Sequence, residues 1–377
     1  MQDVRISAID IQWKIPSTGP GVSDNNPLRR NSMRIVDLRS DTVTKPTAAM
    51  RQAISAAQVG DDVFGEDPTV NHLEEMAAER LGKPAALFVA SGTMANIVSQ
   101  LTHCNRGDEA ILGDQSHIFF YEQGGSAALG GIHPRTVPNQ IDGKLSLDDI
   151  EAAVRPDNIH FPRTRLIILE NTHNRCHGSP LDPDYMHAVG EIARRYDLKL
   201  HVDGARLFNA AVTLGVEPQR LAADADSVSI CLSKGLGAPA GSIVCGTRKF
   251  IAQARRARKV LGGGMRQAGI LAAAGVVALT EMTERLADDH ANAAKLAEGL
   301  AHIQGVSVNA ELVRTNIVYF EIARGDMTPQ LLEQRLKTDG VLLSPTGANQ
   351  MRAVTNYHVT SDDIEYVLNS FSRALES

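Results

Sequence analysis

The sequence has few cysteines and no cysteine pattern that indicates a metal site or a redox pair. Neither a CxxC pair nor a Cys/His ligand spacing occurs around its four cysteines, which are Cys104, Cys176, Cys231 and Cys245. Two of them stand inside apolar runs, where cysteines are usually buried and inert. We therefore expect a reducing, cytoplasmic compartment and no bound metal.

Excess positive charge and long apolar runs are also absent. The net charge of −6 gives no electrostatic basis for binding nucleic acid or an anionic membrane. The longest apolar stretch, near residues 270–279, is too short and too rich in alanine to cross a membrane, so we interpret it as a buried helix. The basic run 255–259 is short and predicts one solvated helix face.

The composition is that of an ordinary soluble globular protein, with 377 residues of which 43% are hydrophobic and 22% charged. This length predicts two domains. Residues 1–33 are rich in Ser, Pro, Gly, Asn and Arg and lack a continuous apolar segment, so we interpret them as a disordered or non-native extension. We expect residues 34–280 to form an N-terminal segment and a large domain, and residues 281–377 a small C-terminal domain.

Short apolar runs alternate with helical patterns between residues 83 and 245. This alternation predicts an α/β fold with a mostly parallel sheet covered by helices on both faces, its strands at 85–89, 110–112, 165–170, 198–203, 228–232 and 242–245. One long helix is expected over 267–303. The elements after it predict a smaller α+β unit, with segments at 317–320, 329–339, 341–343, 351–354 and from 362 onward.

A carboxylate and an amine stand at the ends of two of these predicted strands. Asp203 ends one run and Lys234 follows another, and a glycine comes directly after each. Because α/β sheets build their sites at strand ends, we expect the two side chains to be neighbours. A nucleophilic amine beside a carboxylate that can keep a heterocyclic nitrogen protonated indicates pyridoxal phosphate (PLP). The alternatives are a solvated loop lysine and an aspartate that only caps a helix.

Ser91-Gly92-Thr93 follows a predicted strand and opens a predicted helix. Backbone N–H groups at a helix N-terminus bind phosphate, and glycine allows close approach, although an ordinary N-cap gives the same pattern. Neither Gly-Lys-Ser/Thr nor the glycine pattern of a dinucleotide fold is present, which argues against a nucleotide-dependent enzyme.

Other side chains are weaker candidates when they are considered one at a time. His117 follows a predicted strand and suits ring stacking or proton transfer, yet single histidines are more often structural. Arg206 lies one helical turn after Asp203, where it can hold a carboxylate or simply pair with Asp203. A glycine-rich loop before Arg266 suits anion binding or a plain hinge. The residues alone thus indicate a PLP enzyme that acts on an amino acid, without identifying the reaction.

Together, the motifs resemble the low-specificity L-threonine aldolases, which are fold type I, aspartate-aminotransferase-like PLP enzymes. The resemblance covers the chain after Met33 and rests on DLRSDTVT at 37–44, GDDVFGEDP at 60–68, SGTMAN at 91–96, ENTHN at 170–174, HVDGAR at 201–206, CLSKGLGAP at 231–239 and GGGMRQAGILAAAG at 262–275. So many ordered matches have far more weight than any one motif.

The resemblance implies a role for each matching residue. Lys234 would form the Schiff base with PLP, Asp203 would contact the pyridine nitrogen and His117 would stack on the ring. Phosphate contacts would come from Gly92 and Thr93, and from Arg266 of a neighbouring subunit in a homotetramer. The β-hydroxyl would lie near His117 and His160. The substrate carboxylate would be held by Ser40, Arg206 and Arg352, of which Arg206 would also contact the cofactor, and Tyr121 and Glu122 would lie in the same pocket segment. One departure from the family is Asn356, which stands where a histidine is usual, with His358 two residues further on.

The implied activity is retro-aldol cleavage of L-threonine and L-allo-threonine to acetaldehyde and glycine. The substrate would be a β-hydroxy-α-amino acid, and no nucleic acid or membrane partner is expected. Another PLP activity on amino acids, such as β-elimination, racemisation or transamination, would use the same lysine and aspartate. A non-catalytic protein that binds PLP or an amino acid is the alternative from a different class.

Overall fold

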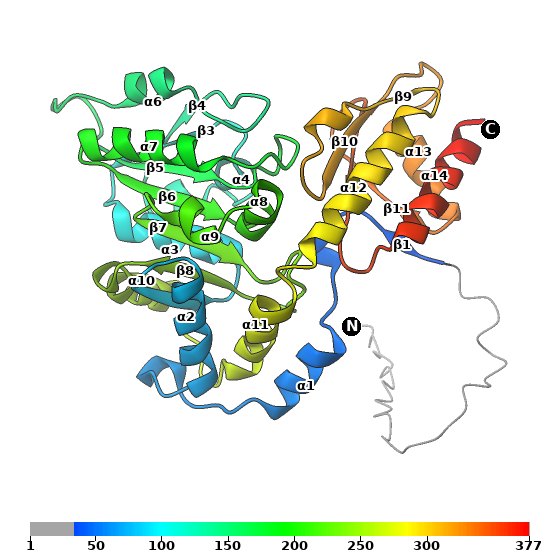
Figure 1. The fold of residues 1–377 in the computed structure, drawn as a ribbon. Helices are drawn as coiled ribbons and strands as arrows, with labels where there is room; N and C mark the ends of the chain where they lie inside the picture. The colour runs from blue at the N-terminus through cyan, green and yellow to red at the C-terminus, as the bar shows by residue number, and fades with distance from the viewer. Residues whose placement is uncertain (1–33, 377) are drawn as a thin grey trace, which may run out of the picture. The chain divides into compact units, whose positions relative to one another are not determined.

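The computed structural model describes residues 34–376, and the residues from Ile35 onward form one compact unit (Figure 1). The predicted extension over residues 1–33 lies outside the described residues. Two sheets organise the rest of the chain, one of seven strands and one of four, with a further two-stranded pair. The division into domains at residues 280 and 281 stays a prediction.

The seven-stranded sheet has the strand order β2-β8-β7-β6-β5-β3-β4. Every neighbouring pair is parallel except the two that β8 makes. The mostly parallel α/β sheet is thereby confirmed. Its strands are β2 Ala85–Val89, β3 Glu109–Gly113, β4 His133–Val137, β5 Thr164–Glu170, β6 Lys199–Gly204, β7 Ser227–Cys231 and β8 Ser242–Gly246.

Helices cover both faces of this sheet because its buried strands are apolar on both sides. In β2, Ala86 and Phe88 face one core, while Leu87 and Val89 face another. The first core is completed by α1 Ala48–Ala56, α2 Pro68–Arg80, α6 Leu147–Ala153, α7 Pro183–Arg195, α8 Leu207–Leu214, α9 Pro218–Ala222 and α11 Gly269–Glu281. The second is completed by α3 Gly92–His103 and α10 Arg248–Val260. Shorter helical turns are α4 His117–Phe120, α5 Gly125–Ala128, η2 Asp41–Val43 and η3 Asp62–Phe64.

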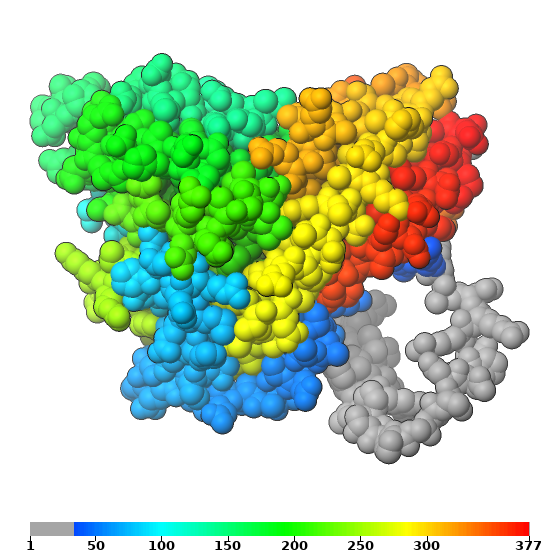
Figure 2. Space-filling view, in the orientation of Figure 1, coloured from blue at the N-terminus to red at the C-terminus, as the bar shows by residue number. Residues whose placement is uncertain are grey.

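The chain leaves the large sheet through two helices rather than one. The predicted single helix over 267–303 is wrong, because α11 ends at Glu281 and α12 (Leu286–Ala301) begins only after a four-residue turn. This turn lets α12 run on to the smaller sheet, where Figure 2 shows it beside α14 (Ser361–Glu376). The remaining elements there are β9 Val306–Ser307, η4 Ala310–Leu312, β10 Ile317–Ile322, α13 Pro329–Thr338, β11 Val341–Leu342, β12 Ser344–Pro345 and β13 Gln350–Val354.

The first described strand belongs to this C-terminal part of the fold. β1 (Val36–Asp37) pairs in parallel with β11, about 300 residues later in the chain, and Val36 and Leu38 pack in the core formed with α12 and α14. The segment directly after β1 is therefore fixed between the two sheets. This position matters because Ser40 and Asp41 lie on it.

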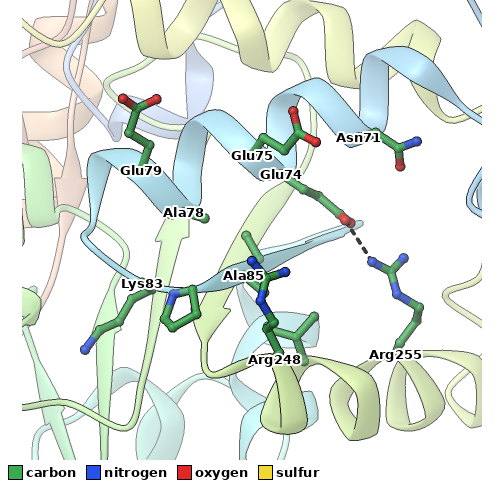
Figure 3. Close-up of a pocket in the computed structure, with 12 residues that line it drawn as sticks. Asn71, Glu74, Glu75, Ala78, Glu79, Lys83, Ala85, Arg248 and Arg255 are labelled. Atoms are coloured by element: carbon green, nitrogen blue, oxygen red, sulfur yellow. Dashed lines mark hydrogen bonds and ion pairs between the residues drawn. The ribbon is translucent and has the colours of Figure 1, made fainter.

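The basic run 255–259 is a solvated face only in part, because Arg256 and Lys259 are exposed but Arg258 is buried. Arg258 is 2% exposed, and its guanidinium donates to Asp62 Oδ2 and to the Phe88 carbonyl, each at 2.7 Å. Arg255 pairs with Glu74 at 2.8 Å beside a groove of about 610 Å³ between α2 and α10 (Figure 3). The sequence predicts that a basic residue inside a helical run is exposed, because the buried residues that pair with it belong to distant segments of the chain.

Removing the Arg258 guanidinium should strongly destabilise the fold. Arg258→Ala leaves the 1% exposed Asp62 carboxylate without its closest cation, and breaking a buried pair in this way costs about 3–5 kcal/mol. Urea unfolding of the purified protein measures this loss. Arg256→Ala, an exposed position on the same helix, serves as the matched control and should change stability by less than about 0.5 kcal/mol. Equal unfolding midpoints for both variants would contradict the expectation.

The four cysteines are free and buried, including Cys231 and Cys245, the two for which the sequence predicts burial. Burial raises the pKa of the Cys104 and Cys176 thiols to about 12, which keeps them protonated and unreactive. No helix within residues 34–376 combines the length and apolar character needed to span a bilayer.

Candidate active site

A cavity of about 460 Å³ opens at the carboxyl edge of the large sheet, against the smaller one. Its walls come from both sheets and from the segment after β1, and they are formed by Ser40, Thr42, His117, Tyr121, Asn174, Arg206, Lys234, Ser344, Pro345, Thr346 and Arg352. The cavity brings together six of the residues that the sequence predicts: Ser40, His117, Tyr121, Arg206, Lys234 and Arg352.

Lys234 is half-buried in the cavity wall, three residues after β7. Its backbone carbonyl accepts a hydrogen bond from Thr44 Oγ1 at 3.0 Å, which ties the loop to the segment after β1. The Nζ atom makes no hydrogen bond or ion pair with any residue in the range 34–376. A lysine with its backbone held and its amine directed into a cavity is suited to act as a nucleophile rather than as a solvated surface charge.

Asp203 is 3% exposed and lies behind His117 at the end of β6. Oδ1 accepts the Ala205 N–H at 3.1 Å, and Oδ2 accepts from Asn96 Nδ2 at 2.9 Å. The helix-cap alternative is wrong, because α8 begins at Leu207 and no side chain caps it. The carboxylate is therefore fixed in orientation.

Arg206 pairs with Asp41 and not with Asp203. Its Nε and Nη2 atoms each lie 2.7 Å from an Asp41 carboxylate oxygen, and both residues are buried. Burial raises the pKa of Asp41, but the charge and hydrogen bonds of Arg206, together with the charge of Lys234, outweigh burial and hold that pKa below its usual value. Nη1 of Arg206 has no partner among the described residues and remains free to contact a ligand in the cavity. Nothing in the local sequence singled out Asp41.

Arg352, on β13, supplies a second guanidinium to the cavity. Its Nη1 donates to Asn174 Oδ1 at 3.0 Å and its Nη2 to the Arg39 carbonyl at 3.2 Å, while the buried Nε has no partner among the described residues. Two arginines near the Ser40 hydroxyl suit a carboxylate ligand. Asn356, the departure from the family, donates instead to the Asp37 carbonyl at 3.2 Å and is not part of the cavity wall.

The N-terminus of α3 provides a site that suits a phosphate. Ser91 Oγ accepts from the Met94 N–H at 3.2 Å, which leaves the N–H groups of Gly92 and Thr93 without a bond to any described residue. A Cβ atom on Gly92 would lie 3.8 Å from Ser242 Oγ, a buried hydroxyl that also lacks a described partner. These orphaned donors fit the phosphate of PLP. Sequence reasoning missed Ser242, because a single serine in a strand carries no signal.

His117 forms the cavity wall above Asp203. Its Nδ1 lies 2.9 Å from Glu122 Oε1, and its backbone N–H donates to Glu170 Oε2 at 2.7 Å. Burial lowers the pKa of the His117 imidazole, but the Glu122 hydrogen bond and the Asp203 charge outweigh it and the net shift is upward. Glu122 is 5% exposed and lies behind the histidine, outside the cavity wall.

Tyr121 stands at the rim of the cavity. Its side chain is half exposed, and its hydroxyl accepts from Arg175 Nη1 at 2.8 Å. The Arg175 guanidinium lies 4.0 Å from the centre of the Phe120 ring, which fixes the rim further. Tyr121 is therefore placed to contact the outer part of a ligand.

Two predicted residues lie elsewhere. His160 is exposed in the loop before β5, at the amino end of the strand rather than at the carboxyl edge, and is not part of the cavity of its own chain. Arg266 is also outside that cavity; it is 57% exposed and pairs with Asp61 at 3.0 Å. The sequence roles of both residues stay predictions.

Two histidines, the buried His201 and the half-buried His103, share one hydroxyl partner. Both contact the Ser227 hydroxyl, His103 through Nε2 and His201 through Nδ1, each at 2.8 Å. Burial lowers the pKa of His201 to about 4 and that of His103 to about 3. Both side chains are therefore neutral in the folded protein at physiological pH.

Stability of the cofactor-free protein should fall as the pH drops from about 6.5 toward 4. Histidine in the unfolded chain titrates near pH 6.5, so below that value the unfolded chain binds protons that the folded chain excludes. The free energy of unfolding therefore falls by about 1.4 kcal/mol per pH unit for each histidine. Urea unfolding at several pH values should show a shallower decline for His201→Asn than for the wild type. His72→Asn, at an exposed position of α2, should leave the slope unchanged. A wild-type slope in His201→Asn would contradict this account. Burial raises the pKa of Asp289 to about 6, so protonation of this carboxyl opposes the decline in stability. Its contribution is common to the variants and cancels when they are compared.

Comparison with known proteins places this site in a family. The family model for beta-eliminating lyases matches residues 37–323. Low-specificity L-threonine aldolase 1 of Arabidopsis thaliana is 50% identical over 91% of this chain and 97% of its own length. The low specificity L-threonine aldolase of Escherichia coli K12 is 46% identical over 88% of this chain and 97% of its own.

Solved structures show the same fold. The threonine aldolase of Leishmania major superposes with a TM-score of 0.76 at 20% identity, over 89% of this chain and 98% of that one. This likeness confirms the fold class, and the sequence matches extend across both sheets. The chain belongs to the beta-eliminating lyase family, within its group of low-specificity L-threonine aldolases.

Proposed function

We propose that this protein is a PLP-dependent aldolase that cleaves L-threonine and L-allo-threonine to glycine and acetaldehyde. The observation that carries the proposal is one cavity that holds the free amine of Lys234 together with two guanidinium groups, those of Arg206 and Arg352. The buried carboxylate of Asp203 lies within 4.8 Å of a ring nitrogen of His117, which lines this cavity. The near full-length identity with curated L-threonine aldolases supports the same activity.

The residues at the carboxyl edge of the sheet suit PLP. Lys234 provides the amine that anchors the cofactor, and Asp203 provides the negative charge that keeps a ring nitrogen protonated. Gly92 and Thr93 provide N–H donors for the phosphate. When bound, PLP accepts into its ring the electron pair of a bond broken at the substrate Cα.

The remaining residues of the cavity bind and orient the substrate. Arg206, Arg352 and Ser40 hold its carboxylate, which fixes the rotation about Cα and so selects the bond to Cβ for cleavage. His117 is placed to take the proton of the β-hydroxyl, because it lines the cavity and its ring is held from behind by Glu122. Tyr121, at the rim, contacts the part of the substrate that leaves as the aldehyde.

The assembly is a homotetramer in which Arg266 reaches the phosphate site of a neighbouring chain. Its exposure and its position outside the cavity of its own chain support this arrangement. Phe64, which is 74% exposed in the segment that carries Asp61, also suits burial against a second copy. The compartment is the cytoplasm, in keeping with four free, buried cysteines.

Product analysis separates this function from other PLP activities. Incubation of the PLP-loaded protein with L-threonine should release acetaldehyde, with no ammonia, 2-oxobutanoate or D-threonine. Ammonia with 2-oxobutanoate would instead show β-elimination, and D-threonine would show racemisation. Bound PLP with no product from any β-hydroxy amino acid would show a binding protein and overturn the proposal.

A further inference from the structure

Asn96 connects the two carboxylates that lie behind the cavity. It is 2% exposed on the second turn of α3, and its Nδ2 lies 2.9 Å from Asp203 Oδ2 and 2.8 Å from Glu122 Oε1. The amide nitrogen has two protons, so each carboxylate receives one. Without such a bridge, two buried like charges at this separation would repel each other.

The neighbours of Asn96 also fix which way its amide is turned. Oδ1 lies 3.1 Å from Ser229 Oγ and 3.3 Å from His201 Nε2, both of which can donate a proton. The reversed amide would place its oxygen against two carboxylates and its nitrogen against those donors. Only one orientation therefore satisfies all four contacts.

This orientation determines the positions of the protons around it. His201 must donate from Nε2, so its Nδ1 accepts from the Ser227 hydroxyl, and Ser227 Oγ in turn accepts from His103 Nε2. The low pKa values of both histidines agree with these neutral forms. Each hydrogen bond of this network therefore has a fixed donor and a fixed acceptor.

The same logic extends toward the cavity. Glu122 Oε1 accepts from Asn96, and the ionised carboxylate also accepts from His117 Nδ1, although burial and the Asp203 charge raise the pKa of Glu122. The other ring nitrogen, Nε2, is then the one left for the cavity. The charged groups that face His117 are Glu122 and Asp203 behind it, Lys234 across the cavity, and Glu170 at its backbone N–H.

We propose that Asn96 is a positioning residue, whose amide holds Asp203 and Glu122 in place and thereby keeps His117 with its Nδ1 proton inward and Nε2 toward the substrate. This proposal rests on the proposed function, because it assigns Asp203 to the cofactor ring and His117 Nε2 to the β-hydroxyl. Asn96 touches neither ligand and acts through these two residues. The SGTMAN motif thus ends on a residue with a role separate from phosphate binding.

Asn96→Asp gives a test with a pH signature. The new side chain has nearly the same shape, but it donates one hydrogen bond when protonated and none when ionised. The PLP affinity of the apoprotein, measured relative to the wild type at each pH, should be highest near pH 6, where the protonated side chain still donates one hydrogen bond. It should fall by about tenfold or more near pH 8.5. In the loaded enzyme kcat should fall while KM for threonine stays within about twofold, since Asn96 is not part of the cavity wall.

Two further variants serve as controls. Asn96→Ser keeps one hydroxyl donor at every pH, so its loss of PLP affinity should not depend on pH. This variant also preserves the test if Asn96→Asp does not fold. Ser99→Ala, at a fully buried position of the same helix whose hydroxyl bonds only to the Ala95 carbonyl, should match the wild type in PLP affinity.

The outcomes distinguish this proposal from the proposed function on which it rests. If the wild-type apoprotein binds PLP but Asn96→Asp shows a pH-independent affinity ratio, the positioning role is wrong and the proposed function stands. If Asn96→Asp and Asn96→Ser show the same pH dependence, the positioning role is also wrong. If the wild-type apoprotein does not bind PLP at all, the proposed function fails, and the role of Asn96 fails with it.

Discussion

Lys234→Ala is expected to abolish both the absorbance band of the PLP–lysine imine and the cleavage of threonine. Among the described residues, Lys234 is the only lysine that lines the cavity, so alanine leaves no amine from this part of the chain in that wall to bond to the cofactor. The variant should still fold, because Lys234 Nζ makes no hydrogen bond or ion pair with the described residues. Absorbance spectra after PLP addition, together with an acetaldehyde assay, measure both effects.

The matched control is Lys45→Ala, which removes an exposed lysine near the segment after β1. It should keep the imine band and the activity. If Lys234→Ala kept both, the covalent role of Lys234 would be ruled out.

Asp203→Asn should lower kcat by about 10²–10³-fold, the usual cost of losing one buried electrostatic contact to the reacting group. Asparagine keeps the shape but removes the charge that holds a ring nitrogen protonated. Because Lys234 is untouched, the imine band should persist at saturating PLP, unlike in Lys234→Ala. Steady-state kinetics with L-threonine, alongside the spectrum, provide the measurement.

Asp184→Asn controls for the chemical change itself, since Asp184 is exposed in the first turn of α7. Its kcat should equal that of the wild type. A wild-type kcat in Asp203→Asn would show that the carboxylate does not act on the cofactor, and the reason for its burial would then be structural only.

The large sheet could be predicted from the sequence because strands buried on both faces are short apolar runs separated by helical patterns. β4 was missed for the complementary reason: His133–Val137 is polar, contains a proline and forms an edge of the sheet. The break between α11 and α12 was missed because no proline or glycine marks it. Arg258 was read as solvated because its partners, Asp62 and Phe88, lie far away in the chain.

For the site as well, a residue could be predicted where its pattern is local, and not where its contacts are distant in the chain. Lys234, Asp203 and Gly92 were found because each follows or ends a strand, where a local pattern is visible. Asp41 and Asn96 stand within the motifs at 37–44 and 91–96, but no local pattern marks a role for them, since their contacts, to Arg206 and Asp203, span more than 100 residues. Only the folded structure shows which buried polar residues share hydrogen bonds.

The most direct test of the central claim is the joint measurement of acetaldehyde and glycine released from L-threonine and from L-allo-threonine, with and without added PLP. We expect equimolar release that depends on PLP, and the ratio of the two rates will define the stereochemical preference. If PLP binds but neither product appears from either substrate, the fold and the family stand and the aldolase activity is contradicted.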